Sequence, residues 1–211
     1  MIELKNISKS FSGKTILTNF SLSINKGEFV SIMGESGAGK TTVLNMIGLL
    51  DKPEKGTVSI DGHLNPNRKV TMYLRRHKFG YIFQNYVLMN NETVKDNLLI
   101  SQAYSNNFSN EIMINNLEKV GLDATYLEKK VYQLSGGEQQ RIAIARVMLK
   151  PCEIILADEP TGNLDDLNKE VILNLFKHLK ASGKTIICVT HDKEVAEWSD
   201  RIINIERLFY S

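Results

Sequence analysis

Only two cysteines and one tryptophan occur among the 211 residues, and basic and acidic residues nearly balance, at 26 and 24. Cys152 and Cys188 have neither metal-type spacing nor a partner motif, so we expect reduced thiols in the core and no disulfide network. Because basic and acidic residues are nearly equal in number, the sequence lacks the strong net positive charge typical of nucleic-acid-binding proteins. The basic cluster around Arg75 and Arg76 is interpreted as a solvated face. We therefore expect no nucleic-acid partner.

Long apolar runs are also missing from the sequence. No stretch approaches the roughly 18 apolar residues that a membrane-spanning helix requires. The first residues, from Met1 to Ile7, alternate like a strand and lack the apolar block of a secretory signal. These absences predict a cytoplasmic chain with no spanning segment of its own.

The glycine-rich stretch at residues 34–42 is the most informative motif in the sequence. Residues 29–33 before it form an apolar run typical of a strand, and the residues from 42 to 50 have helical spacing. Backbone N–H groups of such a loop, with the following helix N-terminus, bind phosphate oxygens. Lys40 would neutralise the β and γ phosphates and Thr41 would hold Mg²⁺; a glycine turn without a ligand is the less favoured alternative. The pattern G-x-x-x-x-G-K-[ST] is carried by Gly34, Glu35, Ser36, Gly37, Ala38, Gly39, Lys40, Thr41 and Thr42.

The order of the predicted elements indicates an α/β fold. Antiparallel strands come first, residues from about 90 to 150 show only helical patterns, and strands and helices alternate again afterwards. We predict one domain over residues 1–211, with a P-loop NTPase (RecA-like) core at about 1–89 and 151–211, an antiparallel β subdomain, and an inserted helical subdomain at about 90–150. The helix expected at 166–180 would place Leu167, Val171, Leu175 and Leu179 on one apolar face.

Polar side chains directly follow several predicted strands, and they should converge at the carboxyl edge of the sheet. Asp158 can reach the Mg²⁺ shell, and Glu159 can orient or deprotonate the attacking water. His191 is predicted to contact the terminal phosphate, and Gln84 ends another strand. A solvated Asp-Glu turn and a purely structural histidine are the alternatives.

Residues 134–141, Leu-Ser-Gly-Gly-Glu-Gln-Gln-Arg, predict a second anion site. Ser135 would cap a helix, Glu138 would complete a capping box, and Gly136 and Gly137 would leave backbone N–H groups exposed. This string resembles the signature of the ATP-binding-cassette (ABC) ATPases. The other motifs follow in family order over essentially the whole chain.

The resemblance implies an enzyme that hydrolyses ATP with Mg²⁺ as a head-to-tail homodimer, or as a dimer with a related subunit. Ser135 and Gly137 of one copy would bind ATP held by the P-loop of the other. Phe11 would stack on adenine, Gln84 would reach Mg²⁺ and the attacking water, and Asp165 would lie in the segment that touches the other copy's site.

Residues 27–34 and 158–165 most resemble the branch that contains macrolide exporters, lipoprotein-releasing ATPases and bacteriocin exporters of Gram-positive bacteria. That resemblance implies a subunit on the inner face of the membrane, which powers export or membrane extraction through separate transmembrane permease subunits. Three positions depart from the family pattern. Val131 replaces a proline, Thr41-Thr42 replaces Ser-Thr, and no Asp-Gly turn occurs near Glu206-Arg207, which suggests a truncated end without a regulatory domain.

Four alternatives remain at this point. An importer subunit shares the same motifs. A soluble ABC ATPase of translation or DNA repair is disfavoured because neither a second cassette nor a coiled-coil insert is present, and the 134–141 signature disfavours a small-molecule P-loop kinase. The presence of Lys40, Asp158, Glu159 and His191 disfavours a non-hydrolysing cassette.

The apolar residues that follow Gln84 are the expected contact with the permease. By resemblance, Tyr86 with Leu88 or Met89 would supply the apolar contact, and the basic stretch around Arg75 and Arg76 would lie at its rim. The alternative is that this loop folds into the core.

Overall fold

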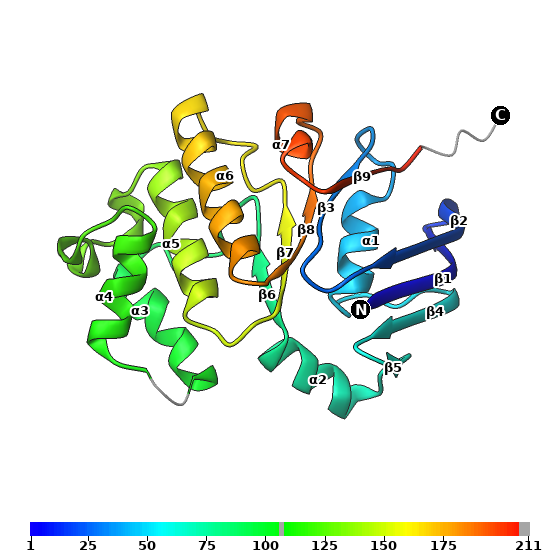
Figure 1. The fold of residues 1–211 in the computed structure, drawn as a ribbon, viewed down its shortest axis with the longest axis horizontal. Helices are drawn as coiled ribbons and strands as arrows, with labels where there is room; N and C mark the ends of the chain where they lie inside the picture. Colours follow the sequence, from blue (N-terminus) through cyan, green and yellow to red (C-terminus); the bar gives the residue numbers. More distant parts are fainter. Residues whose placement is uncertain (106–107, 207–211) are drawn as a thin grey trace.

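The computed structural model describes residues 1–105 and 108–206, so Arg207, at the third departure from the family pattern, lies outside them. Two sheets flank a central helix, and most of the other helices cover the far side of the second sheet (Figure 1). The strands are β1 (Ile2–Phe11), β2 (Lys14–Ile24), β3 (Phe29–Met33), β4 (Lys55–Ile60), β5 (His63–Leu64), β6 (Phe79–Ile82), β7 (Ile154–Asp158), β8 (Thr185–Val189) and β9 (Arg201–Asn204).

The first sheet is antiparallel, with the order β2-β1-β4-β5. Ile2 pairs with Ile24 on one side and with Ile60 on the other, and all three side chains are buried. Alternation of apolar and polar residues is typical of a sheet that faces the core on one side. The predicted antiparallel strands are therefore confirmed.

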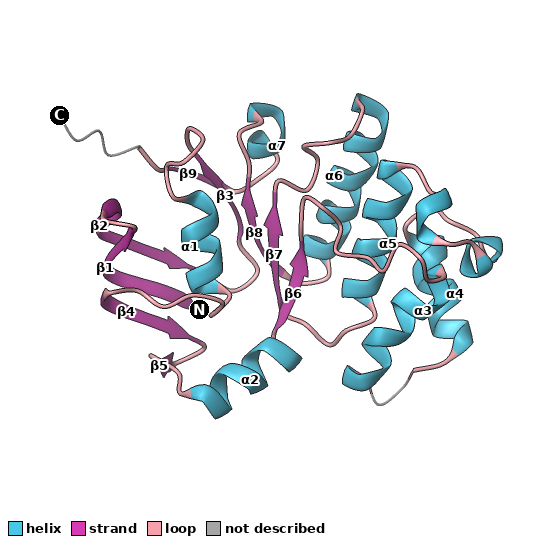
Figure 2. Ribbon diagram, turned by 180° about the vertical axis from the view of Figure 1, so that it is seen from behind, coloured by secondary structure: helices cyan, strands magenta, loops and turns pink. Residues whose placement is uncertain are grey.

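The second sheet is parallel, with the order β6-β7-β8-β3-β9. Figure 2 shows the arrows of β6, β7 and β8 pointing the same way. All five residues of β8 are buried, as expected for a strand with both faces covered. Asp158 pairs with Val189 at the ends of β7 and β8, so the polar residues that follow these strands meet at one edge.

Helices cover both faces of the parallel sheet. Helix α1 packs between the two sheets through Val43, Met46 and Ile47, whereas α5 and α6 pack on the opposite face with α3 and α4 beyond them (Figure 1). This arrangement confirms the predicted α/β fold with an added antiparallel sheet. The helices are α1 (Lys40–Ile47), α2 (Arg68–His77), α3 (Val94–Leu99), α4 (Asn110–Lys119), α5 (Gly136–Met148), α6 (Asp166–Ala181) and α7 (Lys193–Glu197).

Residues 94–148 form α3, α4 and α5, joined by 3-10 turns at Ile100–Tyr104, Ala124–Glu128 and Val131–Gln133. Ser109 caps α4 by accepting a hydrogen bond from the Ile112 N–H, as the sequence predicted. Ser135 and Glu138 form the predicted capping box at the start of α5. These caps fix where α4 and α5 begin.

The sequence analysis did not predict α2, which begins at an Asn67 cap and carries the basic cluster on a largely exposed surface. The prediction for α6 is only partly correct. Leu175 and Leu179 are buried as predicted, but Leu167 is 79% exposed and Val171 is 39% exposed, while Ile172 and Phe176 are fully buried. The buried stripe is therefore rotated by about one residue in the first half of the helix, because α6 packs on both α5 and the sheet instead of on a single neighbour.

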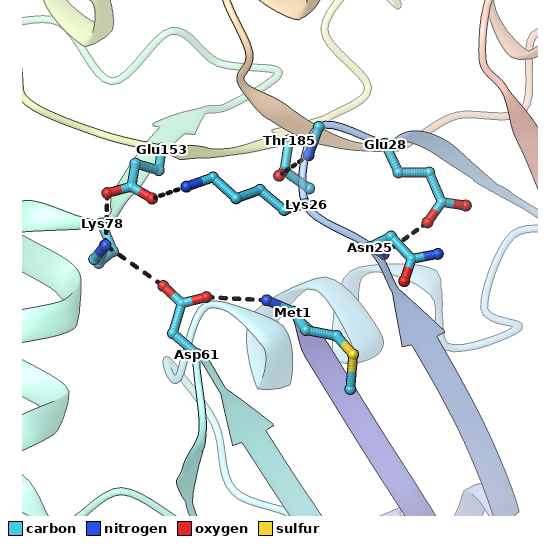
Figure 3. Close-up of polar contacts among 9 residues, drawn as sticks. Met1, Asn25, Lys26, Glu28, Asp61, Lys78, Glu153 and Thr185 are labelled. Atoms are coloured by element: carbon cyan, nitrogen blue, oxygen red, sulfur yellow. Dashed lines mark hydrogen bonds and ion pairs between the residues drawn. The ribbon is translucent and has the colours of Figure 1, made fainter.

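Ion pairs link the two sheets at the end opposite the carboxyl edge (Figure 3). Lys78 on the β6 side contacts Glu153 at 2.5 Å and Asp61 at 3.5 Å, and Lys26 contacts Glu153 at 3.3 Å. The Gly27 N–H also donates to Thr185 Oγ1 at 2.9 Å. Exposed pairs of this kind add little stability, so we interpret them as fixing the angle between the sheets.

Candidate functional site

A cleft of about 670 Å³ opens at the carboxyl edge of the parallel sheet. It is formed by the loops after β3, β6, β7 and β8, with two residues from the antiparallel sheet on one side. Its lining consists of Phe11, Ile16, Gly34, Glu35, Ser36, Gly37, Gly39, Lys40, Thr41, Thr42, Gln84, Asp158, Glu159, Val189 and His191. Most of the candidate residues from the sequence analysis thus share one cleft.

The glycine-rich loop runs from β3 into α1. Gly37 and Gly39 have φ values of +80° and +100°, in the region that glycine alone adopts without strain. Lys40 Nζ donates to the carbonyl oxygens of Gly34 (2.8 Å) and Glu35 (3.1 Å), which holds the lysine across the loop. Ala38 differs from the others because its side chain is 1% exposed and packs in the core instead of lining the cleft.

Thr41 and Asp158 lie together at the floor of the cleft. Thr41 Oγ1 donates to Asp158 Oδ1 at 3.3 Å. Burial is the main influence on the pKa of Asp158 and raises it; the charge of Glu159 raises it further, whereas the Thr41 hydrogen bond and Lys40 act in the opposite direction. A desolvated carboxylate of this kind is stabilised by a cation.

Glu159 and His191 form a second polar pair. His191 Nδ1 lies 2.9 Å from Glu159 Oε1, and the Glu159 side chain is 15% exposed. Glu159 Oε2 is buried without a hydrogen-bond partner within residues 1–105 and 108–206. The residue has φ +46°, an unfavourable value for glutamate that the Glu159 N–H to Val189 O bond helps to hold. The strained backbone aims a carboxylate with a free acceptor into the cleft.

Two apolar residues of the lining were missed by the sequence reading. Ile16 from β2 carries no distinctive motif, and only the position of the antiparallel sheet beside the parallel one places it here, whereas Val189 lines the cleft as the last residue of β8. Phe11, which is 49% exposed, and Gln84 both line the cleft as expected.

Ser135, Gly136, Gly137 and Asp165 are absent from the cleft lining. Ser135 is exposed at the N-terminus of α5, and Asp165 caps α6 by accepting from the Asn168 N–H at 2.8 Å. The sequence reading also missed Gln140, which is fully buried and donates from Nε2 to the Pro160 carbonyl at 2.7 Å. Gln140 joins the signature helix to the loop that carries Glu159.

The loop after Gln84 is fastened to the helical region by its backbone. Arg146 donates to the carbonyl oxygens of Val87 (2.6 Å) and Tyr86 (3.2 Å). A Cβ at Gly136 would lie 2.8 Å from the Tyr86 hydroxyl, and Leu88 packs against the core. Tyr86 and Leu88 are therefore partly buried by the chain itself, which agrees for these two residues with the alternative that the loop folds into the core.

Asn97 anchors the same loop from α3. It is fully buried, accepts from the Met89 N–H at 2.7 Å, and donates to the Met89 carbonyl at 3.2 Å and to the Thr93 carbonyl at 2.9 Å. These bonds satisfy both backbone groups of Met89.

We expect Asn97→Ala to lower the free energy of unfolding by about 1–3 kcal/mol, because the Met89 N–H loses its partner, whereas the Met89 carbonyl still accepts from the Glu92 N–H. Urea denaturation of both proteins measures the difference. Asn91→Ala, an exposed position in the same loop, should change stability by less than about 0.5 kcal/mol. Equal stability of the Asn97 variant and wild type would show that the loop is held by other contacts.

The family model described as ABC transporter matches residues 17–162, which is more than half of the chain. The chain therefore belongs to the ABC transporter family. The macrolide export ATP-binding/permease protein MacB of Campylobacter jejuni (strain 81-176) is 44% identical over a 216-residue alignment that covers 98% of this chain and 33% of MacB. MacB of Hyphomonas neptunium is 42% identical, with 97% and 33% coverage. The chain thus spans about a third of the length of these curated relatives.

Solved structures agree with this assignment. The dimeric structure of MJ0796, described as a bacterial ABC transporter cassette, has a TM-score of 0.88 and 41% identity, covering 98% of this chain and 94% of that chain. The post-hydrolysis dimer of MJ0796 bound to ADP and Pi has a TM-score of 0.87 and 40% identity, with 99% and 97% coverage. Resemblance to the ABC ATPases and to the branch containing macrolide exporters is confirmed, and the chain is an ATP-binding cassette.

Two further features are absent from the part of the chain that the structure describes, a membrane-spanning helix and a cluster of metal-ligating side chains. Within residues 1–105 and 108–206, no helix combines the length and apolar character needed to cross a bilayer. In the same part of the chain, no three histidine, cysteine or acidic side chains gather as a metal centre. A cation in the cleft would therefore rely on hydroxyl, amide and phosphate oxygens in addition to Asp158.

Proposed function

We propose that this chain is the ATP-hydrolysing subunit of an exporter, and that it works as a dimer beneath separate permease subunits. The observation that carries the proposal is the buried, unpartnered Oε2 of Glu159 in the same cleft as the phosphate-binding loop. A buried carboxylate oxygen without a donor fits a water molecule that it would orient and deprotonate. Sequence similarity to MacB, an export protein by name, supports the direction of transport.

In this proposal ATP is the substrate, and the loop from Gly34 to Gly39 binds its phosphates through backbone N–H groups. Lys40 neutralises the β and γ phosphates by leaving the loop carbonyls of Gly34 and Glu35. Phe11 and Ile16, on the apolar side of the cleft, stack on and flank the adenine. Glu159 takes the proton of the attacking water, and His191 holds the Glu159 carboxylate and contacts the terminal phosphate.

The cleft also fits Mg²⁺. Thr41 Oγ1, the Gln84 side-chain oxygen and the desolvated Asp158 carboxylate are hard oxygen donors of the kind that this ion prefers. When bound, the ion would neutralise charge on the phosphates during transfer. The raised pKa of Asp158 supports this role, because a cation would restore the ionised form.

Dimer formation completes the site in this proposal. Ser135 and Asp165 are exposed and lie outside the cleft of their own chain, so they can reach the ATP of a second copy. Gly137 is buried against Asn168, contrary to the expectation that both glycines would be exposed. Dimeric structures of the related cassette MJ0796 support the arrangement. Phosphate release from MgATP, together with a second-order dependence of the rate on protein concentration, tests both parts.

The permease contact is proposed at the loop after Gln84. Val87 is 51% exposed and Met89 is 42% exposed, while Arg146 and Asn97 hold their backbone. These apolar side chains are exposed on a loop whose backbone is held in place, and the loop follows Gln84, the proposed Mg²⁺ ligand. A contact here could couple ATP hydrolysis to movement of the permease. Met89 is among the contacts expected from the sequence, and Val87 takes the place of Tyr86 and Leu88.

We expect Val87→Ser with Met89→Ser to leave ATP binding intact and to lower recovery of the permease from solubilised membranes by about tenfold or more, because apolar contact area is lost. Pull-down at equal expression measures this. Leu50→Ser with Ile202→Ser, two exposed apolar residues outside the loop, is the matched control. Equal permease recovery and transport by the loop variant and wild type would place the coupling contact elsewhere.

A further inference from the structure

Asn168, in the first turn of α6, holds the Asp165 carboxylate in place. Its side-chain Nδ2 donates to Asp165 Oδ1 at 2.9 Å and to Oδ2 at 3.1 Å, and its backbone N–H donates to Oδ1 at 2.8 Å. The backbone and side-chain hydrogen bonds from Asn168 lower the pKa of Asp165. A helix cap needs only the backbone bond, so the two side-chain bonds serve the orientation of the carboxylate.

The same side chain reaches across to the signature helix. Arg141 Nη1 of α5 donates to Asn168 Oδ1 at 2.9 Å. Asn168 also rests directly on the signature glycine, since a Cβ added to Gly137 would lie 2.2 Å from Asn168 Oδ1. The Asn168 side-chain amide therefore accepts a hydrogen bond from α5 and donates hydrogen bonds to Asp165.

These contacts join two separate segments, residues 135–137 and Asp165, that both lie outside the cleft of their own chain. On the basis of the proposed dimeric function, we propose that Asn168 is a positioning residue that builds this surface in advance for the ATP bound by a second copy. It acts through Gly137 and Asp165, and neither Asn168 nor the residues that it hydrogen-bonds line the cleft of its own chain. Its loss should therefore damage the partner's site and spare its own.

The chain offers matched variants for a test. Asn168→Ala removes both the donor and the acceptor, and Asn168→Asp keeps the size and the acceptor for Arg141 but replaces the donor with a negative charge beside Asp165. Glu170→Ala, at an exposed position of α6 without a hydrogen bond or ion pair among the described residues, is the control. ATP binding by the isolated subunit should match wild type in all three variants. Thermal unfolding of the isolated subunit measures how much stability each Asn168 variant loses with the bonds to Asp165 and Arg141.

We expect homodimers of either Asn168 variant to hydrolyse ATP at least about tenfold more slowly than wild type, because hydrogen bonds to a charged group are lost. The Glu170 variant should match wild type. This comparison alone does not separate action on the partner's site from a local defect, so heterodimers isolated through two different tags are needed.

A heterodimer of Lys40→Ala and Asn168→Ala contains one site with an intact P-loop facing an intact Asn168. It should be as active as the Lys40→Ala and Ser135→Arg heterodimer. With both changes placed on one chain and wild type as the other, neither site is intact, so activity should be lost. Recovery by the second arrangement, or by neither, would overturn the role of Asn168. Failure of the Ser135 reference heterodimer would instead overturn the proposed dimeric function.

Discussion

Replacing Glu159 with glutamine should leave ATP binding intact and slow hydrolysis by about 10²- to 10⁴-fold. The amide preserves the shape of the side chain but does not accept the proton of the attacking water. Glu159 lines the cleft, and its Oε2 has no hydrogen-bond partner among the described residues, so this carboxylate keeps an unused acceptor. Single-turnover phosphate release measures the effect, and an ATP-bound dimer should accumulate.

Glu153→Gln is the matched control for this prediction. It makes the same chemical change next to the opposite end of β7, where Glu153 pairs with Lys26 and Lys78. The control should hydrolyse ATP at the wild-type rate. Unchanged turnover in the Glu159 variant would remove this residue from the chemical step and leave the proton to another acceptor.

Lys40→Ala and Ser135→Arg should each abolish turnover, yet for different reasons. Lys40 is 9% exposed beneath the loop, and its removal deletes the positive charge that the phosphates need. Ser135 lies outside its own cleft, so an arginine there should spare ATP binding by the isolated subunit and block only the partner's site. Heterodimers of the two variants should regain one intact site.

Loss of the cap at Ser135 lowers helix stability by about 1 kcal/mol, which needs its own control. Ser109→Arg removes the equivalent cap from α4, because Ser109 accepts from the Ile112 N–H in the same way. That variant should keep full turnover. If verified Lys40 and Ser135 heterodimers stay inactive, the two copies do not share their sites.

The predictions from sequence failed where contacts between distant segments decide which side chains are buried. Periodicity placed Leu167 and Val171 on the apolar face of α6, but the stripe that is buried depends on how α5 and the sheet meet this helix. In the loop after Gln84, residues 86–89 are all apolar, so the sequence pattern does not show which of them are exposed. The backbone bonds from Arg146 and Asn97, residues far along the chain or on another helix, decide that Val87 and Met89 are the exposed pair.

The sequence by itself determined the order of most strands and helices, although not α2, together with the phosphate-binding loop, the caps at Ser109 and Ser135, and the polar residues that follow the strands. These features follow from local periodicity and side-chain chemistry. Only the tertiary structure decided that Ile16 joins the cleft, that Glu159 Oε2 is left without a partner, and that Asn168 links Gly137 to Asp165. Such contacts depend on the distance and angle between elements that are far apart in the chain. Packing of whole sheets and helices sets these distances and angles, and no local pattern encodes them.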